Sequence, residues 1–88
     1  MPTVCVFNGI VPRMYVNDHN PPHFHAEHGG DEAFISIATG EMIEGRLARA
    51  AAHLVRKWAL ARQRELLDNW ARGRAGKLPQ RILEPDAD

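Results

Sequence analysis

The sequence is poor in cysteine, which excludes two common ways of stabilising a small protein. Its 88 residues include one cysteine, Cys5. One thiol cannot form an internal disulfide, and a four-cysteine zinc site is excluded within one chain. We therefore expect a reduced, cytoplasmic protein in which Cys5 is a small core residue.

Long apolar segments and several enzyme motifs are also missing. No apolar run approaches the roughly 18 residues that a membrane span needs, and the stretch MPTVCVFNG lacks the basic and apolar regions of a signal peptide. Neither a lysine nor the start of a helix follows Gly29-Gly30, so no phosphate-binding glycine loop is indicated. No G-x-S-x-G nucleophile elbow occurs. We expect no membrane association.

What is present is the composition of an ordinary globular domain, with 44% hydrophobic and 25% charged residues. A chain of this length forms one small domain, which we place at residues 1–81, followed by a frayed tail at residues 82–88. Such a domain buries only about 60% of the surface that its unfolded chain exposes, so a partner or dimerisation would stabilise it.

The formal net charge of zero hides two halves of opposite sign. Residues 1–45 contain six acidic residues and one base, Arg13, and therefore carry a charge of −5. Residues 46–81 contain ten bases and two acidic residues, a charge of +8. Such a chain can bind an acidic protein or contact nucleic-acid phosphates; alternatively, the basic residues only solvate a helix face.

The first half of the chain predicts four to five short antiparallel strands within residues 3–45. The segment TVCVF is rich in β-branched residues, and Asn8-Gly9 after it is a strong hairpin signal. IVPRMYVN alternates but contains Pro12, which indicates a sheet edge or a bulge. After the turn-forming NDHNPP, we expect strands at HFHAEH, AFISIA and EMIEG.

Alternation along HFHAEH predicts which side chains share a face of the sheet. Phe24 and Ala26 fall on one face, and His23, His25 and Glu27 fall on the other. We expect the first face to pack against helices and the second face to be open.

From residue 46 the apolar spacing becomes helical, but it changes phase along the segment. The stripe through Leu66, Leu67 and Trp70 is rotated by roughly 130° from the stripe before it. A straight helix on one core does not change phase in this way. We therefore predict two helices, or one kinked helix, over about residues 46–75, with the break near Arg62-Gln63. A sheet followed by helices on one face is an α+β fold.

The end of the second helical segment is marked by small residues. Gly73 and Gly76 are expected to end it, and Pro79 prevents it from resuming.

Four of the five histidines lie in NDHNPPHFHAEHGG, residues 17–30. His23 and His25 leave one face of a strand about 6.5–7 Å apart at the backbone, from where two imidazoles can converge on one ion. Glu27 continues the same face, and His19 can reach in from the turn. These four residues are the candidate ligands of a divalent transition metal such as zinc, nickel, copper or iron.

Acid–base chemistry without a metal is a second interpretation of the cluster. One neutral and one protonated histidine can cleave RNA by moving protons at the ribose 2′-hydroxyl and the leaving oxygen. His19, His23 and His25 are then candidate catalytic residues, with Arg13 as the phosphate ligand. The pattern also fits a purely structural turn, so enzyme activity stays open.

The same residues resemble a known family. The D-H-x-P-P-H-x-H signature at residues 18–25, followed by ISIATGEMIEGRL and LVRKWALARQRELLDNW, is similar to the small bacterial proteins of the domain of unknown function family 4160. The resemblance extends from MPTV to Gly76-Lys77. It implies a compact α+β domain from a bacterium or archaeon. Such proteins are often encoded beside another short protein, as toxin–antitoxin pairs are, which implies a protein partner.

Two functions are therefore expected, and we favour the first. It is a cytoplasmic module that binds a small protein partner or a second copy of itself in a two-gene, toxin–antitoxin-like system, through Arg49, Arg56 and Lys57. The second is a site of His19, His23 and His25, with Glu27 or Asp18 in support, that binds a divalent metal or acts by acid–base chemistry on RNA phosphodiesters.

Overall fold

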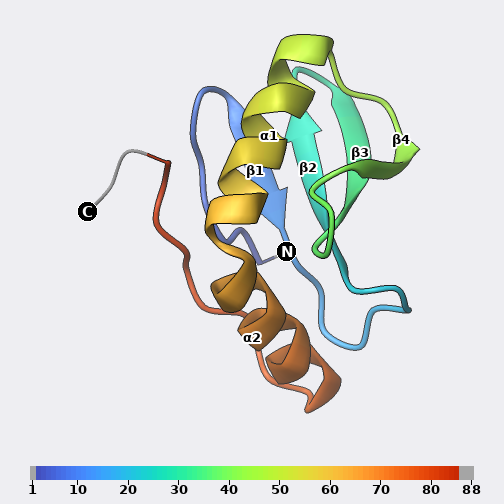
Figure 1. The fold of residues 1–88 in the computed structure, drawn as a ribbon. Helices are drawn as coiled ribbons and strands as arrows, with labels where there is room; N and C mark the ends of the chain where they lie inside the picture. The colour runs from blue at the N-terminus through green and yellow to red at the C-terminus, as the bar shows by residue number, and fades with distance from the viewer. Residues whose placement is uncertain (1, 86–88) are drawn as a thin grey trace.

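The computed structural model describes residues 2–85 and shows an α+β fold, as predicted: a four-stranded antiparallel sheet followed by two helices (Figure 1). The strands follow one another in the sheet in chain order. The elements are β1 (Ile10–Arg13), β2 (His23–His28), β3 (Asp31–Ser36), β4 (Met42–Gly45), α1 (Arg49–Ala61) and α2 (Gln63–Arg74). Within residues 2–85, no helix is both long and apolar enough to cross a membrane.

The predicted hairpin at Asn8-Gly9 is present, but TVCVF before it does not form a full strand. Phe7 and Ile10 exchange both backbone hydrogen bonds, at 3.0 and 2.8 Å, around a turn in which Asn8 and Gly9 have positive φ. Before the turn, the chain makes only isolated bridges to β1. This N-terminal segment nevertheless lies along the outer edge of β1, where the Val4 N–H donates to the Pro12 carbonyl at 3.0 Å.

One face of the sheet packs against α1, which crosses in front of it in Figure 1. Phe24 and Ala26 of β2 are fully buried on this face, as the alternation predicted. Trp58 of α1 meets the Phe24 ring edge to face, with the ring centroids 5.5 Å apart, and also contacts Phe7. Aromatic pairs of this kind contribute beyond their buried area.

The predicted break between the helices is also present. Arg62, with φ −117° and ψ 23°, separates α1 from α2. The expectation that Gly73 ends the second helix is wrong, because α2 continues to Arg74. Gly73 is instead buried within the helix, where the Tyr15 carbonyl passes so close that a Cβ would lie 3.2 Å from its oxygen. The absence of a side chain lets α2 approach the segment before β2.

The packed part of the chain extends beyond Arg81, where the sequence placed the start of a frayed tail. Ile82 is buried, and its N–H donates to the Val4 carbonyl at 2.7 Å. The indole N–H of Trp58 donates to the Leu83 carbonyl at 2.9 Å. The apolar side chain at residue 82 and these two hydrogen bonds hold the segment beside the N-terminal one. Residues 86–88 of the expected tail lie outside the described residues.

Candidate metal centre

The turn between β1 and β2 carries Asp18 back to the histidines of β2. Asn17 has a positive φ of 59°, and its N–H donates to the Gly73 carbonyl of α2 at 3.1 Å. Asp18 follows, and its Oδ2 lies 3.0 Å from His25 Nε2 and 3.2 Å from His23 Nε2. One ligand atom from each of these three residues lies within 4.8 Å of the other two. We call this group the Asp18 cluster.

His23 is held in one orientation at the start of β2. Its side chain is 2% exposed, and its Nδ1 lies 2.7 Å from the Pro21 carbonyl. A carbonyl only accepts, so Nδ1 carries the proton and donates it. Nε2 is then left facing Asp18, and it is buried without a hydrogen bond. Histidines that bind metals commonly donate their second N–H to a backbone carbonyl in this way.

His25 lies between two carboxylates. Its Nε2 is hydrogen-bonded to Asp18 at 3.0 Å, while its Nδ1 lies 3.5 Å from Glu32 Oε2 on β3. If Nε2 binds an ion, the proton can reside on Nδ1, where Glu32 stabilises it. Tyr15 and Phe34 enclose the His25 ring, with centroid distances of 4.4 and 4.3 Å.

The carboxyl of Asp18 is held in its charged form. Burial acts to raise its pKa, but the hydrogen bonds from His25 and from the His19 backbone N–H act in the opposite direction, as does the attraction of His23 and His25. The net result is a pKa below the ordinary value for an aspartate. Asp18 is therefore available as an anionic ligand at neutral pH.

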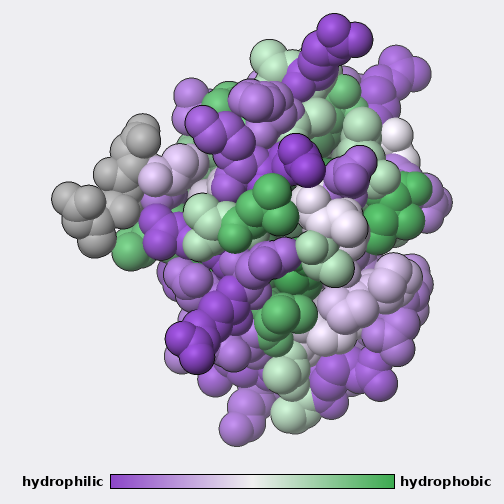
Figure 2. All heavy atoms as spheres, in the orientation of Figure 1, coloured by the Kyte–Doolittle hydropathy of each residue, from purple (hydrophilic) through white to green (hydrophobic). Residues whose placement is uncertain are grey.

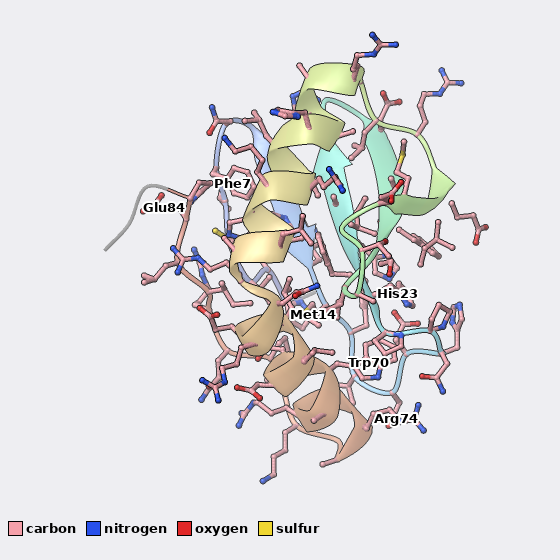
Figure 3. All side chains as sticks on the ribbon, in the orientation of Figure 1. Phe7, Met14, His23, Trp70, Arg74 and Glu84 are labelled. Atoms are coloured by element: carbon pink, nitrogen blue, oxygen red, sulfur yellow. The ribbon has the colours of Figure 1, made fainter. Side chains whose placement is uncertain are left out.

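The histidine face of the sheet is not open along its whole length, contrary to prediction. His23 contacts Trp70 of α2, with ring centroids 5.4 Å apart, and stacks on Phe34 at 5.3 Å. Figure 3 shows His23 and Trp70 between the lower end of the sheet and α2. The reason is that α2 extends past the end of the sheet (Figure 1), and Trp70 of this helix contacts His23.

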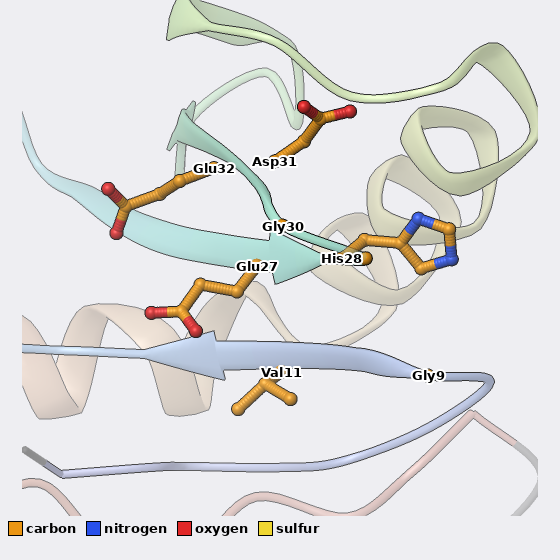
Figure 4. A pocket seen from close by; sticks show the side chains of 8 residues that line it. Gly9, Val11, Glu27, His28, Gly30, Asp31 and Glu32 are labelled. Atoms are coloured by element: carbon orange, nitrogen blue, oxygen red, sulfur yellow. The ribbon is translucent and has the colours of Figure 1, made fainter.

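Glu27 is on the predicted face but is not brought into the cluster. Its Oε2 lies 3.1 Å from Arg13 Nε, so the proposed phosphate ligand is paired with a carboxylate. Glu27 lies opposite Glu32 on the neighbouring strand, and Figure 4 shows both side chains among those that line a pocket at that end of the sheet. Of the two supporting carboxylates that the sequence offered, Asp18 lies in the cluster and Glu27 does not.

His19 lies at the margin of the cluster. Its Nδ1 is 3.1 Å from Asp18 Oδ1, its ring centroid is 5.2 Å from that of His23, and its side chain is 73% exposed. The structure thus brings His23, His25 and Asp18 together, with His19 beside them.

The basic residues singled out for partner binding lie on α1, away from the Asp18 cluster. Arg49, Arg56 and Lys57 are all exposed. Arg49 and Arg56 border a groove between α1 and β4, and Lys57 is not among its lining residues.

Comparison with models of protein families assigns the chain to a family. The sequence model of a domain of unknown function, DUF4160, matches residues 9–71, which include the whole sheet, the whole of α1 and most of α2. The chain belongs to this family. No curated protein and no solved structure matches it.

Proposed function

We propose that the chain binds a divalent transition metal, zinc in the first place, through Asp18, His23 and His25. The observation that carries this proposal is the orientation of His23. Its Nδ1 donates to the Pro21 carbonyl, and its buried Nε2 faces Asp18 Oδ2 without forming a hydrogen bond. A buried polar atom normally has a partner, and an ion between His23 and Asp18 would supply one.

The spacing of the cluster supports the same proposal. With ligand bonds of about 2.0–2.1 Å, the ligand atoms of a tetrahedral zinc site are about 3.3–3.4 Å apart. The Asp18–His23 and Asp18–His25 distances are 3.2 and 3.0 Å. Small outward movements therefore make room for an ion. Three protein ligands leave a fourth position, which His19 or water can fill.

The charge around the cluster supports a cation more than an RNA phosphodiester. Asp18, Glu27 and Glu32 lie on or beside the histidine face, and its nearby base, Arg13, is paired with Glu27. A phosphate at this face would meet carboxylates, and the arginine expected to receive it is already paired with one of them. Acid–base cleavage of RNA by His23 and His25 thus has less support than metal binding.

Calorimetric titration of zinc and nickel into protein without a histidine tag tests the proposal. We expect one ion per chain with a Kd of micromolar or lower, and at least about tenfold weaker binding in Asp18→Asn and His25→Ala. His28→Ala is the matched control, because His28 belongs to the same strand but not to the cluster. A cobalt complex with the absorption of a tetrahedral site would identify the coordination.

Two results would overturn the proposal. One is the absence of binding at a metal concentration of about 100 μM, which would mean a binding free energy weaker than about −5.5 kcal/mol. The other is binding that Asp18→Asn and His25→Ala leave unchanged while His28→Ala weakens it. Circular dichroism of each variant establishes that it is folded.

We also propose that the chain binds a protein partner, and that a neighbouring gene encodes this partner in a toxin–antitoxin-like arrangement. The exposed position of Arg49 and Arg56 beside a groove supports this second function. Co-purification with the product of the adjacent gene tests it directly. Failure of two co-expressed, folded proteins to form a complex would contradict it.

A further inference from the structure

The two edges of the sheet differ in how they are covered. At β1, the N-terminal segment lies along the edge and makes backbone hydrogen bonds at Pro12 and Met14. At the other edge, β4 pairs with β3, and no other segment within residues 2–85 pairs with it. All four residues of β4 are exposed, including Met42 and Ile43 at 44% and 46%. An uncovered edge strand is a template for another strand, and two of the four β4 residues are apolar.

Beside this edge lies the groove between β4 and α1, which we call the β4 groove. It is lined by Gly40, Met42, Arg49, Ala52, His53 and Arg56, among others. Its apolar lining residues are Ile35, Met42 and Ala52. Two cations, Arg49 and Arg56, come from α1, and one carboxylate, Glu41, comes from the residue before β4, so the cations outnumber the carboxylate. Figure 2 shows hydrophobic side chains between charged ones on the face that α1 and β4 present to the viewer.

The walls of the β4 groove are held in place. Gly40 has a positive φ of 73° and lies directly against Arg56, so that a Cβ would be 3.0 Å from Arg56 Cγ. The Gln63 side-chain amide donates to the carbonyls of Ile37 and Ala38, at 2.9 and 2.8 Å. These contacts fix the β3–β4 turn against the helices, so little ordering is needed before a ligand binds.

We propose that β4 accepts an extended segment of a partner protein as a fifth strand, and that this segment carries apolar and acidic side chains. Main-chain hydrogen bonds to β4 supply affinity in this mode of recognition. The carboxylates of the segment face Arg49 and Arg56 on the α1 side of the sheet, and the apolar side chains that alternate with them lie on the opposite side. The inference rests on the proposed protein partner and is independent of the metal centre.

A second copy of the chain is a less suitable occupant. Pairing β4 with the β4 of another copy about a two-fold axis makes the interface self-complementary. The two α1 helices would then lie on the same face of the joined sheet, so Arg49 and Arg56 of one copy would lie on the same side as those of the other. An acidic segment avoids this accumulation of like charge.

Fluorescence anisotropy with labelled eight-residue peptides tests the proposal. The probe alternates valine and glutamate, and the reference peptide alternates valine and lysine. We expect the glutamate peptide to bind at least about tenfold more tightly, and a proline at its centre to abolish binding because one main-chain donor is removed. Arg49→Glu with Arg56→Glu should weaken binding about tenfold, whereas Lys57→Glu, on the same helix outside the groove, should have little effect.

Equal binding of the two peptides, or no effect of Arg49→Glu with Arg56→Glu, would overturn the docking mode. Sedimentation that shows a dimer dissociated by Ile43→Lys would also overturn it, in favour of a second copy. If the adjacent gene product still binds the double variant with unchanged affinity, the partner proposal stands and this mode fails. Circular dichroism and a thermal unfolding midpoint equal to that of the unchanged protein show that the double variant is folded.

Discussion

Asp18 Oδ2 lies 3.0 Å from His25 Nε2, although one residue belongs to a turn and the other to the middle of β2. The two residues are seven positions apart, and no strand periodicity relates them. Their contact depends on the turn at residues 14–22, which α2 holds through the hydrogen bond from Asn17 to Gly73. The site is therefore assembled by tertiary structure.

The Asp18–His25 contact predicts lower stability at acid pH. The pKa of Asp18 is lower in the folded protein than in the unfolded chain, so its contribution is present above about pH 4 and disappears as the pH falls through the folded-state value. In EDTA-treated protein, Asp18→Asn should lower the free energy of unfolding by about 1 kcal/mol at pH 7. Urea unfolding between pH 7 and 3 should show this difference vanish; a constant difference would contradict the assignment.

Glu32 is expected to tune metal affinity without binding the ion. Because it stabilises a proton on His25 Nδ1, Glu32→Gln should weaken zinc binding about 10–100-fold. Glu44→Gln is the matched control, since Glu44 is an exposed carboxylate on the next strand. Competition with a zinc-binding dye measures both affinities. Equal affinities of the two variants would show that Glu32 has no part in orienting His25.

Gly45 is required by the close approach of β3. It has φ +91°, and a Cβ there would collide with the Glu32 carbonyl and approach Ala33 Cα to 2.8 Å. Gly30 has the same φ, but a Cβ at that position would meet no atom within 4 Å beyond its chain neighbours. Gly45→Ala should therefore cost about 1–3 kcal/mol more than Gly30→Ala. Both substitutions introduce the same backbone strain, so the difference between their free energies of unfolding, measured by chemical denaturation, reports the collision. Equal losses of free energy would show that there is no collision.

The C-terminal segment contributes to stability through one buried side chain. Ile82→Ala should cost about 2 kcal/mol, because Ile82 is buried against the N-terminal segment. Leu83→Ala should change stability by no more than about 0.5 kcal/mol, because Leu83 is 50% exposed and its carbonyl bond to Trp58 is retained. Thermal unfolding compares the two, and a larger loss for Leu83→Ala would contradict this packing.

Cys5 should be unreactive at neutral pH and should reduce stability in alkali. Burial raises the pKa of its thiol. The pKa of the thiol is therefore higher in the folded protein than in the unfolded chain. The stability that the neutral thiol contributes is present below about pH 8.5 and is lost as the pH rises through the folded-state pKa. Cys5→Ala should unfold with a weaker dependence on pH between 8 and 10.5. Rapid alkylation of the folded protein at pH 7.5 would show that the thiol is accessible.

Local sequence signals were sufficient for most of the fold. The turn chemistry of Asn8-Gly9, the alternation of Phe24 with Ala26 and the phase change at Arg62 each depend on neighbours in the chain, and each is present in the structure. TVCVF was different. Despite its strand propensity, it makes only isolated bridges to β1.

The site could be located from the sequence but not assembled. Alternation placed His23, His25 and Glu27 on one face, but it relates only residues of the same strand. It does not show that Arg13 binds Glu27 from the neighbouring strand. It also cannot show that the preceding turn returns Asp18 to the histidines, or that Trp70 covers His23, since both depend on contacts between distant segments.

The hydrogen bond from Asn17 to Gly73 joins the turn that carries Asp18 to the last turn of α2. Local opening of the turn would release both the carboxylate and this end of the helix, so the two behave as one cooperative unit. An ion bound by Asp18 and the β2 histidines stabilises only the closed form. Metal binding should therefore slow amide hydrogen exchange in α2, although this helix supplies no ligand to the ion.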